Sequence, residues 1–182
     1  MSSSPPTQPV QPPPPPPPCL HVVLVAPEIP WNTGNAGRTC LAVGAQLHLV
    51  EPLGFSLDER AVRRSGLDYW VRVVPKLHVW PSWAQLEQRL PELGTPFFFA
   101  PRAARDFQDA RYPTRTVLVF GCESVGLPDE MLARYAADTV SIPMRDPELR
   151  SLNLSTTVAV AAYEVRRQWR DVGVRCDEFP SP

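Results

Sequence analysis

Residues 21–38 read HVVLVAPEIPWNTGNAGR, a pattern of side chains that predicts a strand followed by a helix. The first part, His21–Ala26, is short, apolar and rich in β-branched side chains, which is typical of a buried strand. A turn-rich segment follows, after which Asn32 or Thr33 can cap a helix that extends to about Val43.

The alternation of apolar runs and helical segments continues along the chain. Further strands are predicted at 46–50, 70–74, 97–100, 116–120 and 139–142. Helices are predicted at 56–66, at 82–90, from 128 onward and at 154–169. Because the strands are apolar throughout, we expect an α/β fold with a mostly parallel sheet and helices on both faces. Such sheets bind ligands beyond the carboxyl ends of their strands, so the candidate site comprises loops 27–38, 120–128 and 142–155.

The chain of 182 residues is predicted to hold one domain. Ten of the 24 prolines lie within residues 1–18, a stretch without charged residues, so residues 1–19 are expected to form a disordered tail. The folded domain is expected to span residues 20–170, and residues 171–182 are expected to form a C-terminal tail.

Composition excludes several classes of protein. No apolar run approaches the roughly 18–20 residues of a membrane span, and the N-terminal stretch lacks the features of a secretory signal. The four cysteines are scattered, without a Cys-x-x-Cys pair, and only Cys19 has a histidine (His21) close to it in the sequence, so neither a disulfide framework nor a metal site is expected. These features predict a soluble, cytoplasmic protein without a membrane segment.

The net charge is −1, yet 17 of the 18 basic residues are arginine. Guanidinium groups bind phosphate bidentately and stack on bases, which suits RNA. A GC-rich genome also enriches arginine, proline and alanine, so composition alone leaves both explanations open.

The first loop, 27–38, places Asn35 and Arg38 near the start of a helix, where free backbone N–H groups favour anions. Gly34 and Gly37 lie in the first turns, although each costs about 1 kcal/mol relative to alanine in an ordinary helix. Their presence predicts that another group approaches the helix backbone closely. The loop lacks the glycine patterns of a dinucleotide fold and of a P-loop, and a capped helix with a surface arginine is the simpler alternative.

The second loop, 120–128, carries Gly121, Cys122 and Glu123. No histidine has a recognisable relation to Cys122, so a thiol nucleophile is disfavoured. We expect Glu123 to accept hydrogen bonds from neighbouring backbone or asparagine groups.

The third loop, 142–155, contains Ser151, Asn153 and Ser155 at the start of a helix. Ser151 and Asn153 are both good caps, but capping accounts for only one of them. The remaining hydroxyl and amide groups predict a polar wall around a ligand.

Taken together, the three loops resemble those of the SPOUT superfamily of RNA methyltransferases, most closely its tRNA (cytidine(34)-2′-O)-methyltransferase family. The similarity covers about residues 21–168, and its motifs are EIPWNTGNAGR (28–38), HLVEPLGF (48–55), RSGLDYW (64–70), FGCESVGLP (120–128), IPM (142–144) and RSLNLSTTVAVAAYE (150–164). The family usually has Gly-Pro-Glu where this chain has Gly121-Cys122-Glu123, and the loss of proline affects loop rigidity rather than chemistry.

The resemblance implies an α/β sheet whose C-terminal segment forms a deep trefoil knot, with S-adenosylmethionine as cofactor, no metal, and an active site completed across a homodimer. The implied substrate is the 2′-hydroxyl of the wobble nucleotide, cytidine or modified uridine, in the anticodon loop of tRNA. The residues that the resemblance assigns to the cofactor are Phe99, Gly121, Ile142 and Ser151. Those that it assigns to catalysis are Arg38, Asn35, Glu123, Asn153 and Ser155.

Arg38 is the first candidate for chemistry at the ribose hydroxyl. Arginine stays protonated in proteins, so a clamp on the adjacent phosphate is favoured over a general base. Candidate RNA contacts are Arg64, Arg150, Arg166 and Tyr163. Two alternatives remain open: a 2′-O-methyltransferase for another RNA such as rRNA, and a non-catalytic module that binds S-adenosylmethionine or RNA.

Overall fold

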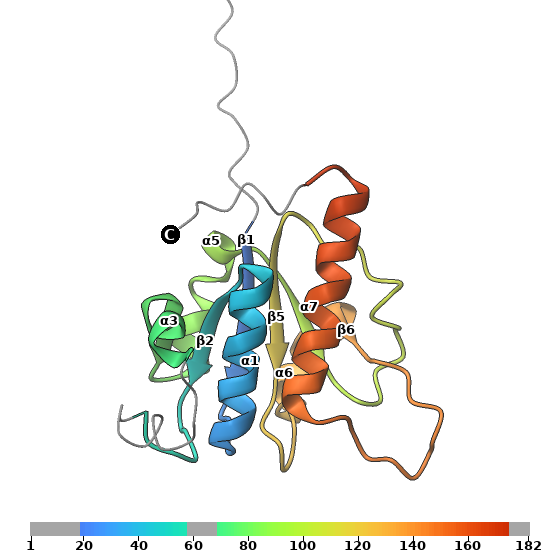
Figure 1. Ribbon diagram of the computed structural model, residues 1–182. Coiled ribbons are helices and arrows are strands. Elements are labelled where there is room, and N and C mark those ends of the chain that lie inside the picture. Colours follow the sequence, from blue (N-terminus) through green and yellow to red (C-terminus); the bar gives the residue numbers. More distant parts are fainter. Residues whose placement is uncertain (1–18, 58–68, 175–182) are drawn as a thin grey trace, which may run out of the picture.

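The computed structural model describes residues 19–57 and 69–174 of the chain. Almost all of the predicted N-terminal tail, most of the helix predicted at 56–66 and most of the predicted C-terminal tail lie outside these residues. The described residues form a six-stranded sheet with helices on both faces (Figure 1). Among the helices of this part of the chain, none is long and apolar enough to cross a membrane.

Neighbouring strands of the sheet all pair in parallel. In chain order the strands are β1 Cys19–Val25, β2 Gln46–Val50, β3 Leu77–Trp80, β4 Thr95–Phe99, β5 Arg115–Phe120 and β6 Thr139–Val140. They lie side by side in the order β3-β2-β1-β5-β4-β6. The order therefore reverses between β1 and β5, which is where parallel α/β sheets bind ligands. The predicted α/β class and the parallel sheet are confirmed.

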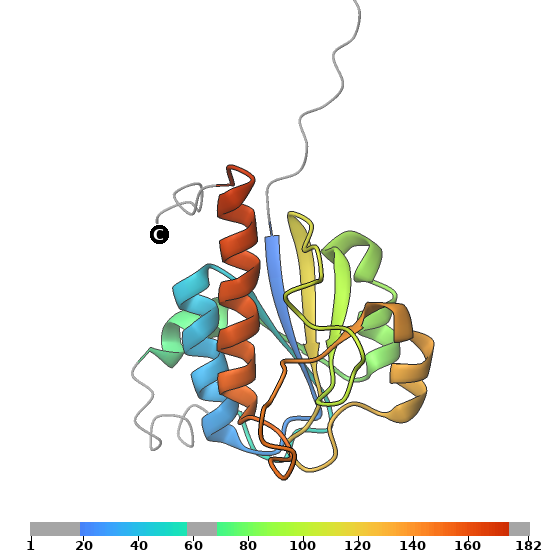
Figure 2. The ribbon, with the colours of Figure 1, turned by 90° about the vertical axis from the view of Figure 1, so that its right-hand side faces the viewer.

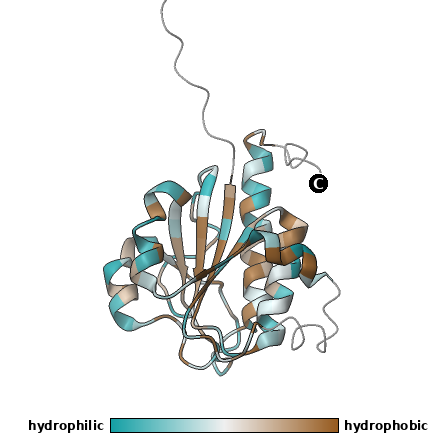
Figure 3. Cartoon of the chain, turned by 90° about the vertical axis from the view of Figure 1, so that its left-hand side faces the viewer, coloured by the Kyte–Doolittle hydropathy of each residue, from teal (hydrophilic) through white to brown (hydrophobic). Residues whose placement is uncertain are grey.

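Helices cover both faces of this sheet. They are α1 Pro30–Val43, α3 Trp70–Val73, α4 Trp83–Glu87, α5 Leu90–Leu93, α6 Asp129–Arg134 and α7 Leu154–Asp171, with 3-10 helices η1 Val74–Lys76 and η2 Ala136–Asp138. Helices α1, α3 and α7 pack on one face, with α1 and α7 side by side, whereas α4, α5 and α6 cover the other (Figures 1 and 2). Much of each central strand is coloured apolar in Figure 3, as expected for strands buried on both faces. The single helix predicted at 82–90 is two short ones.

Gly37 lies where helix α3 meets helix α1. A Cβ atom at this position would lie 3.1 Å from a methyl group of Val73 and 3.3 Å from the ring of Trp70. Both side chains are buried, so α3 packs directly against the backbone of α1. The close approach predicted from the glycines is confirmed at Gly37.

The prediction of a strand at 70–74 is wrong. These residues form α3 and the start of η1, and the strand lies further along, at β3. Trp70 and Val73 are buried whereas Val71 is exposed, which is the three-residue spacing of a helix face rather than the alternation of a strand. Pro75 also disfavours a central strand here, because proline has no N–H to donate to a ladder.

Helix α1 begins earlier than predicted, at Pro30. Proline suits the first helical position, where its missing N–H needs no partner. The N–H groups of Asn32 and Thr33 donate to the carbonyl of Ile29 at 3.1 and 3.3 Å. The side chain of Asn32 is therefore not a cap and takes part in contacts outside the helix.

Two histidines are buried side by side on β1 and β2. His21 Nδ1 and His48 Nε2 are 2.9 Å apart, and Trp80 Nε1 donates to His48 Nδ1 at 3.0 Å. Because His48 Nδ1 accepts from Trp80, its Nε2 carries the proton and donates to His21. Burial lowers the pKa of His21 to about 4 and the pKa of His48 to about 3, so both rings are neutral in the folded protein near pH 7.

Candidate active site

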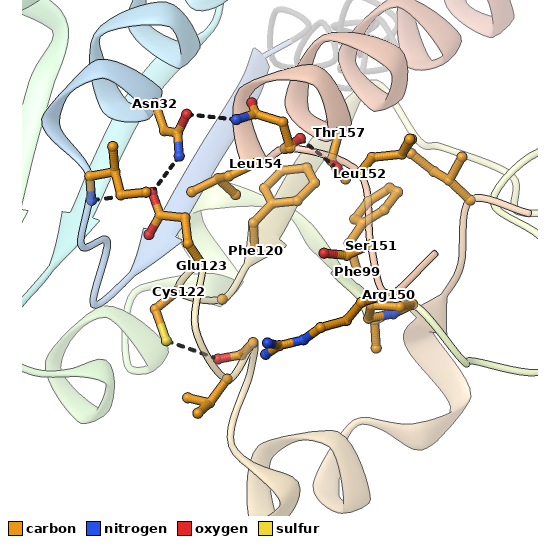
Figure 4. A pocket seen from close by; sticks show the side chains of 18 of the residues that line it. Asn32, Phe99, Phe120, Cys122, Glu123, Arg150, Ser151, Leu152, Leu154 and Thr157 are labelled. Atoms are coloured by element: carbon orange, nitrogen blue, oxygen red, sulfur yellow. Dashed lines mark hydrogen bonds between the residues drawn. The ribbon is translucent and has the colours of Figure 1, made fainter. Parts of the chain in front are cut away.

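A cavity lies at the carboxyl ends of the strands, where the three predicted loops meet (Figure 4). Its volume is about 310 Å³, within the range of roughly 300–1,000 Å³ that is usual for small-molecule sites. The end of β4, all three loops and the first turn of α7 contribute to its wall. The structure brings together on this wall the four residues that the resemblance assigns to the cofactor: Phe99, Gly121, Ile142 and Ser151.

The Glu123 carboxylate connects the second loop to the first. Its Oε2 accepts the backbone N–H of Glu28 at 2.8 Å, and its Oε1 accepts the N–H of Ile29 at 3.3 Å and the side-chain amide of Asn32 at 2.8 Å. These are the backbone and asparagine donors expected for Glu123, so that prediction is confirmed. The Glu28 carboxylate in turn accepts the N–H of Ser124 at 2.9 Å and its hydroxyl at 2.5 Å. The two loops are therefore held together in both directions.

Asn32 extends these contacts to the third loop. Its Oδ1 accepts a hydrogen bond from Nδ2 of Asn153 at 2.9 Å. Asn153 caps α7, because its Oδ1 accepts from the N–H groups of Ser155 at 2.9 Å and Thr156 at 3.3 Å, and from the Ser155 hydroxyl at 2.7 Å. Asn153 is thus the cap that is used, and Ser151 lines the cavity instead.

Asn32 is a site residue that the sequence motifs do not single out. It is only 6% exposed, and each end of its amide bonds to a different loop. The available signal is Pro30, which begins the helix and so removes the need for a cap two residues later. Because this helix start needs no cap, an asparagine within it is expected to hydrogen-bond to a group outside the helix.

The second loop is a tight turn closed by its own backbone. The N–H of Gly126 donates to the carbonyl of Cys122 at 3.0 Å, and the Cys122 thiol donates to the carbonyl of Gly126 at 3.6 Å. Cys122 therefore stabilises the turn at the position where the family usually has proline. A Cβ atom at Gly121 would lie 2.0–2.3 Å from backbone atoms of Gly126 and Leu127, so only glycine fits there.

Asn35 and Arg38 lie apart from this network. Both are exposed on α1, and neither lines the cavity of its own chain. The Arg38 guanidinium lies over the ring of Tyr69, 4.5 Å from its centroid, a cation–π contact that restricts a long side chain. The structure thus separates these two residues from Glu123 and Asn153.

Of the predicted RNA contacts, Arg150 lies at the cavity. It is exposed, and Figure 4 shows its side chain extending towards the Cys122 end of the cavity. Tyr163 is 58% exposed on α7, so its ring is accessible to a base. Arg166 is only 8% exposed and lies 5.6 Å from the ring of Trp169, so its guanidinium is buried rather than presented to a phosphate. Arg64 is outside the described residues.

A parallel sheet with a cavity beyond its strand ends, where the strand order reverses, defines a ligand-binding α/β protein. The cavity wall combines the aromatic rings of Phe99 and Phe120 with the hydroxyl of Ser151 and backbone groups of Gly121. Across residues 19–57 and 69–174, no cluster of three or more histidine, cysteine, aspartate or glutamate side chains is placed to hold a metal ion.

The chain belongs to the SpoU rRNA Methylase family, whose pattern matches residues 19–163. It is 46% identical over 155 residues to the tRNA (cytidine(34)-2′-O)-methyltransferase of Burkholderia cenocepacia (strain HI2424). The aligned region covers 84% of this chain and 96% of that relative. A solved structure that concerns the 2-OH methylation of C/U34 on tRNA is also 46% identical, with a TM-score of 0.77 over 84% of this chain and 97% of the other. The SpoU methyltransferase AviRb of Streptomyces viridochromogenes, solved in complex with the cofactor AdoMet, is 26% identical, with a TM-score of 0.70 over 91% of this chain and 64% of the other. The family expected from the motifs is confirmed.

Proposed function

We propose that this protein transfers a methyl group from S-adenosylmethionine to the 2′-hydroxyl of nucleotide 34, cytidine or modified uridine, in tRNA. The observation that carries the proposal is that all four expected cofactor residues line one cavity, around which the three motif loops are bonded to one another. Two relatives at 46% identity support the substrate, because the name of one and the solved structure of the other concern nucleotide 34 of tRNA.

The cavity suits the chemistry of S-adenosylmethionine. The rings of Phe99 and Phe120 are stacked with centroids 4.7 Å apart and form an apolar wall for a purine. The Ser151 hydroxyl and the backbone groups of Gly121 can hydrogen-bond to the polar parts of the molecule. The bound cofactor supplies an activated methyl group on a sulfonium centre. AviRb, solved with AdoMet bound, supports this choice of cofactor.

Glu123, Asn32 and Asn153 act as positioning residues in this proposal. Methyl transfer requires the acceptor oxygen to lie in line with the methyl group, so correct placement supplies much of the acceleration. The three side chains hold the loops that form the wall and rim of the cavity. Ser155 supports them, because its hydroxyl donates to Asn153.

Arg38 acts on the RNA at the reacting ribose. Its guanidinium stays protonated, so it binds the adjacent phosphate and favours the developing alkoxide instead of removing a proton. Because Asn35 and Arg38 do not line the cavity of their own chain, the proposal assigns them to the cavity of the second subunit of a homodimer. The catalytic domain is residues 20–170, with the trefoil knot that the resemblance implies.

Methyl transfer from labelled S-adenosylmethionine into total tRNA, followed by mapping of the modified nucleotide, tests the proposal. We expect label at the 2′-oxygen of nucleotide 34 and none in rRNA supplied in the same assay. Label in rRNA alone identifies an enzyme for the other RNA. A calorimetric titration without binding of S-adenosylmethionine contradicts both methyltransferase assignments.

A further inference from the structure

A second cavity lies next to the first. It has a volume of about 590 Å³ and is formed by residues 100–105, which follow β4, together with side chains from α6, η2 and β6. Ala100, Pro101 and Arg150 line both cavities, so the two share a wall. The proposed reaction assigns no role to this second cavity.

Three arginines surround it: Arg102, Arg105 and Arg150. No carboxylate lines the cavity, and within the described residues none of the three forms a salt bridge. Arg105 donates only to the carbonyl of Asp109, at a long 3.4 Å. By contrast, the exposed Arg89 pairs with a glutamate of α5 at 2.6 Å. The cavity therefore concentrates positive charge that the described protein groups do not neutralise.

The rest of the lining is mainly apolar. Alanines of the segment after β4, together with Leu132 and Ala136, contribute most of it. Guanidinium forks bind phosphate bidentately, and an apolar surface beside them can pack against a sugar or a base. An isolated small anion would not contact that apolar surface, so the combination of guanidinium groups and an apolar surface fits a nucleotide. With a net charge of −1, the chain does not offer such a cluster as part of a generally basic surface.

We propose that the second cavity binds an RNA phosphate, that of a nucleotide adjacent to the one whose ribose is methylated. The inference rests on the proposed function, because the wall shared through Arg150 puts the phosphate site directly beside the cofactor cavity. It identifies Arg102 and Arg105 as RNA contacts. Binding of the neighbouring nucleotide there fixes the direction in which the strand passes the first cavity.

The double variant Arg102→Ala/Arg105→Ala tests this site. The control Arg89→Ala/Arg170→Ala removes the same amount of charge at the opposite end of the sheet, near the amino-terminal ends of the strands. Arg89 lies shortly before β4, and Arg170 lies at the C-terminal end of α7, which contacts the residues before β5. Binding of tRNA to the full-length protein is measured over a salt series, and methyl transfer at nucleotide 34 is measured on the same samples. Affinity for S-adenosylmethionine is measured in parallel by calorimetry.

We expect the test variant to bind tRNA at least about tenfold more weakly than the control, with a plot of log affinity against log salt that is less steep by about 0.7–0.9, because the variant loses the contact with one phosphate. Affinity for S-adenosylmethionine should not change. The pair Arg102→Lys/Arg105→Lys keeps the charge and should recover most of the salt dependence.

Affinity for tRNA equal to that of the control overturns the inference. Weaker binding of S-adenosylmethionine with unchanged binding of tRNA also overturns it, in favour of a contact with the cofactor carboxylate. Wild-type protein that binds tRNA without methylating nucleotide 34 contradicts the proposed function, whereas the comparison of variants still decides whether the cavity binds phosphate.

Discussion

Replacing Glu123 by glutamine should loosen the three loops around the cofactor cavity. The glutamine oxygen can keep the contacts with Ile29 and Asn32, but its amide nitrogen then faces the N–H of Glu28, which donates to the carboxylate at 2.8 Å. One charge-assisted hydrogen bond is lost and two donors face each other, which costs about 1.5–3 kcal/mol for a buried group. Because Glu123 is partly exposed, we expect a cost of about 2 kcal/mol.

If this loss falls entirely on placement of the acceptor, kcat/KM decreases about 30-fold, since about 1.36 kcal/mol corresponds to a factor of ten. The assay is methyl transfer into tRNA under single-turnover conditions, with urea unfolding of the same preparations. Glu51→Gln is the matched control, because this glutamate is exposed and its side chain has no hydrogen bond within the described residues. A Glu123→Gln protein that equals the control in both rate and unfolding midpoint would refute the reasoning.

Gly121→Ala should abolish calorimetric binding of S-adenosylmethionine, because its Cβ would lie 2.0 Å from the Gly126 backbone. Gly126→Ala should keep binding S-adenosylmethionine, because a Cβ atom at Gly126 would meet open space. It should lose only about 1–2 kcal/mol of unfolding free energy, because its φ of 79° is unfavourable for alanine; equal binding of S-adenosylmethionine by the two variants would contradict the tight turn. Arg38→Ala should slow methyl transfer more than about tenfold at unchanged cofactor affinity, and a rate within a few-fold of wild type removes its role as a clamp. Lowering the pH from about 7.5 to about 5 should cost up to about 2 kcal/mol of unfolding free energy for each of His21 and His48. Below pH 6.5 the unfolded side chains take up protons, whereas the buried rings, with pKa values of about 4 and about 3, stay neutral; equal urea midpoints at both pH values would disprove this.

The sheet can be predicted from the sequence wherever a strand is buried on both faces. The run Val22–Ala26 is apolar at every position, and only a buried strand or a buried helix has that pattern. The prediction for segment 70–74 is wrong because the structure of this segment depends on a contact with a residue far away in the sequence. Trp70 and Val73 form a helix face against Gly37, and no local pattern identifies that partner.

The candidate site is likewise predictable only in part from the sequence. Each loop can be recognised from its own residues, and the acceptor role of Glu123 follows from an acid beside amide-rich segments. Its partners, however, lie 91–95 residues away in the sequence. The first motif offers two asparagines three residues apart, and only the packing of α1 decides between them: Asn32 is buried and bonded, whereas Asn35 is exposed.

The hydrogen bonds of the network limit which residues can take part in proton transfer. Glu123 uses three of about four acceptor positions, Asn32 both donates and accepts, and Asn153 accepts three hydrogen bonds through one oxygen. Protonation of Glu123 would remove the charge that strengthens the three hydrogen bonds it accepts, and so would weaken the contacts that hold the loops. Asn32 and Asn153 are neutral amides whose oxygens already accept hydrogen bonds, and the Ser155 proton is already donated to Asn153. A charge that favours the developing alkoxide must then come from a group outside the network, where the motifs offer Arg38 and Arg150, and the proposed mechanism assigns this role to Arg38. Loss of Arg38 should therefore lower the rate without lowering the stability of the loops, whereas loss of the Glu123 charge should lower both.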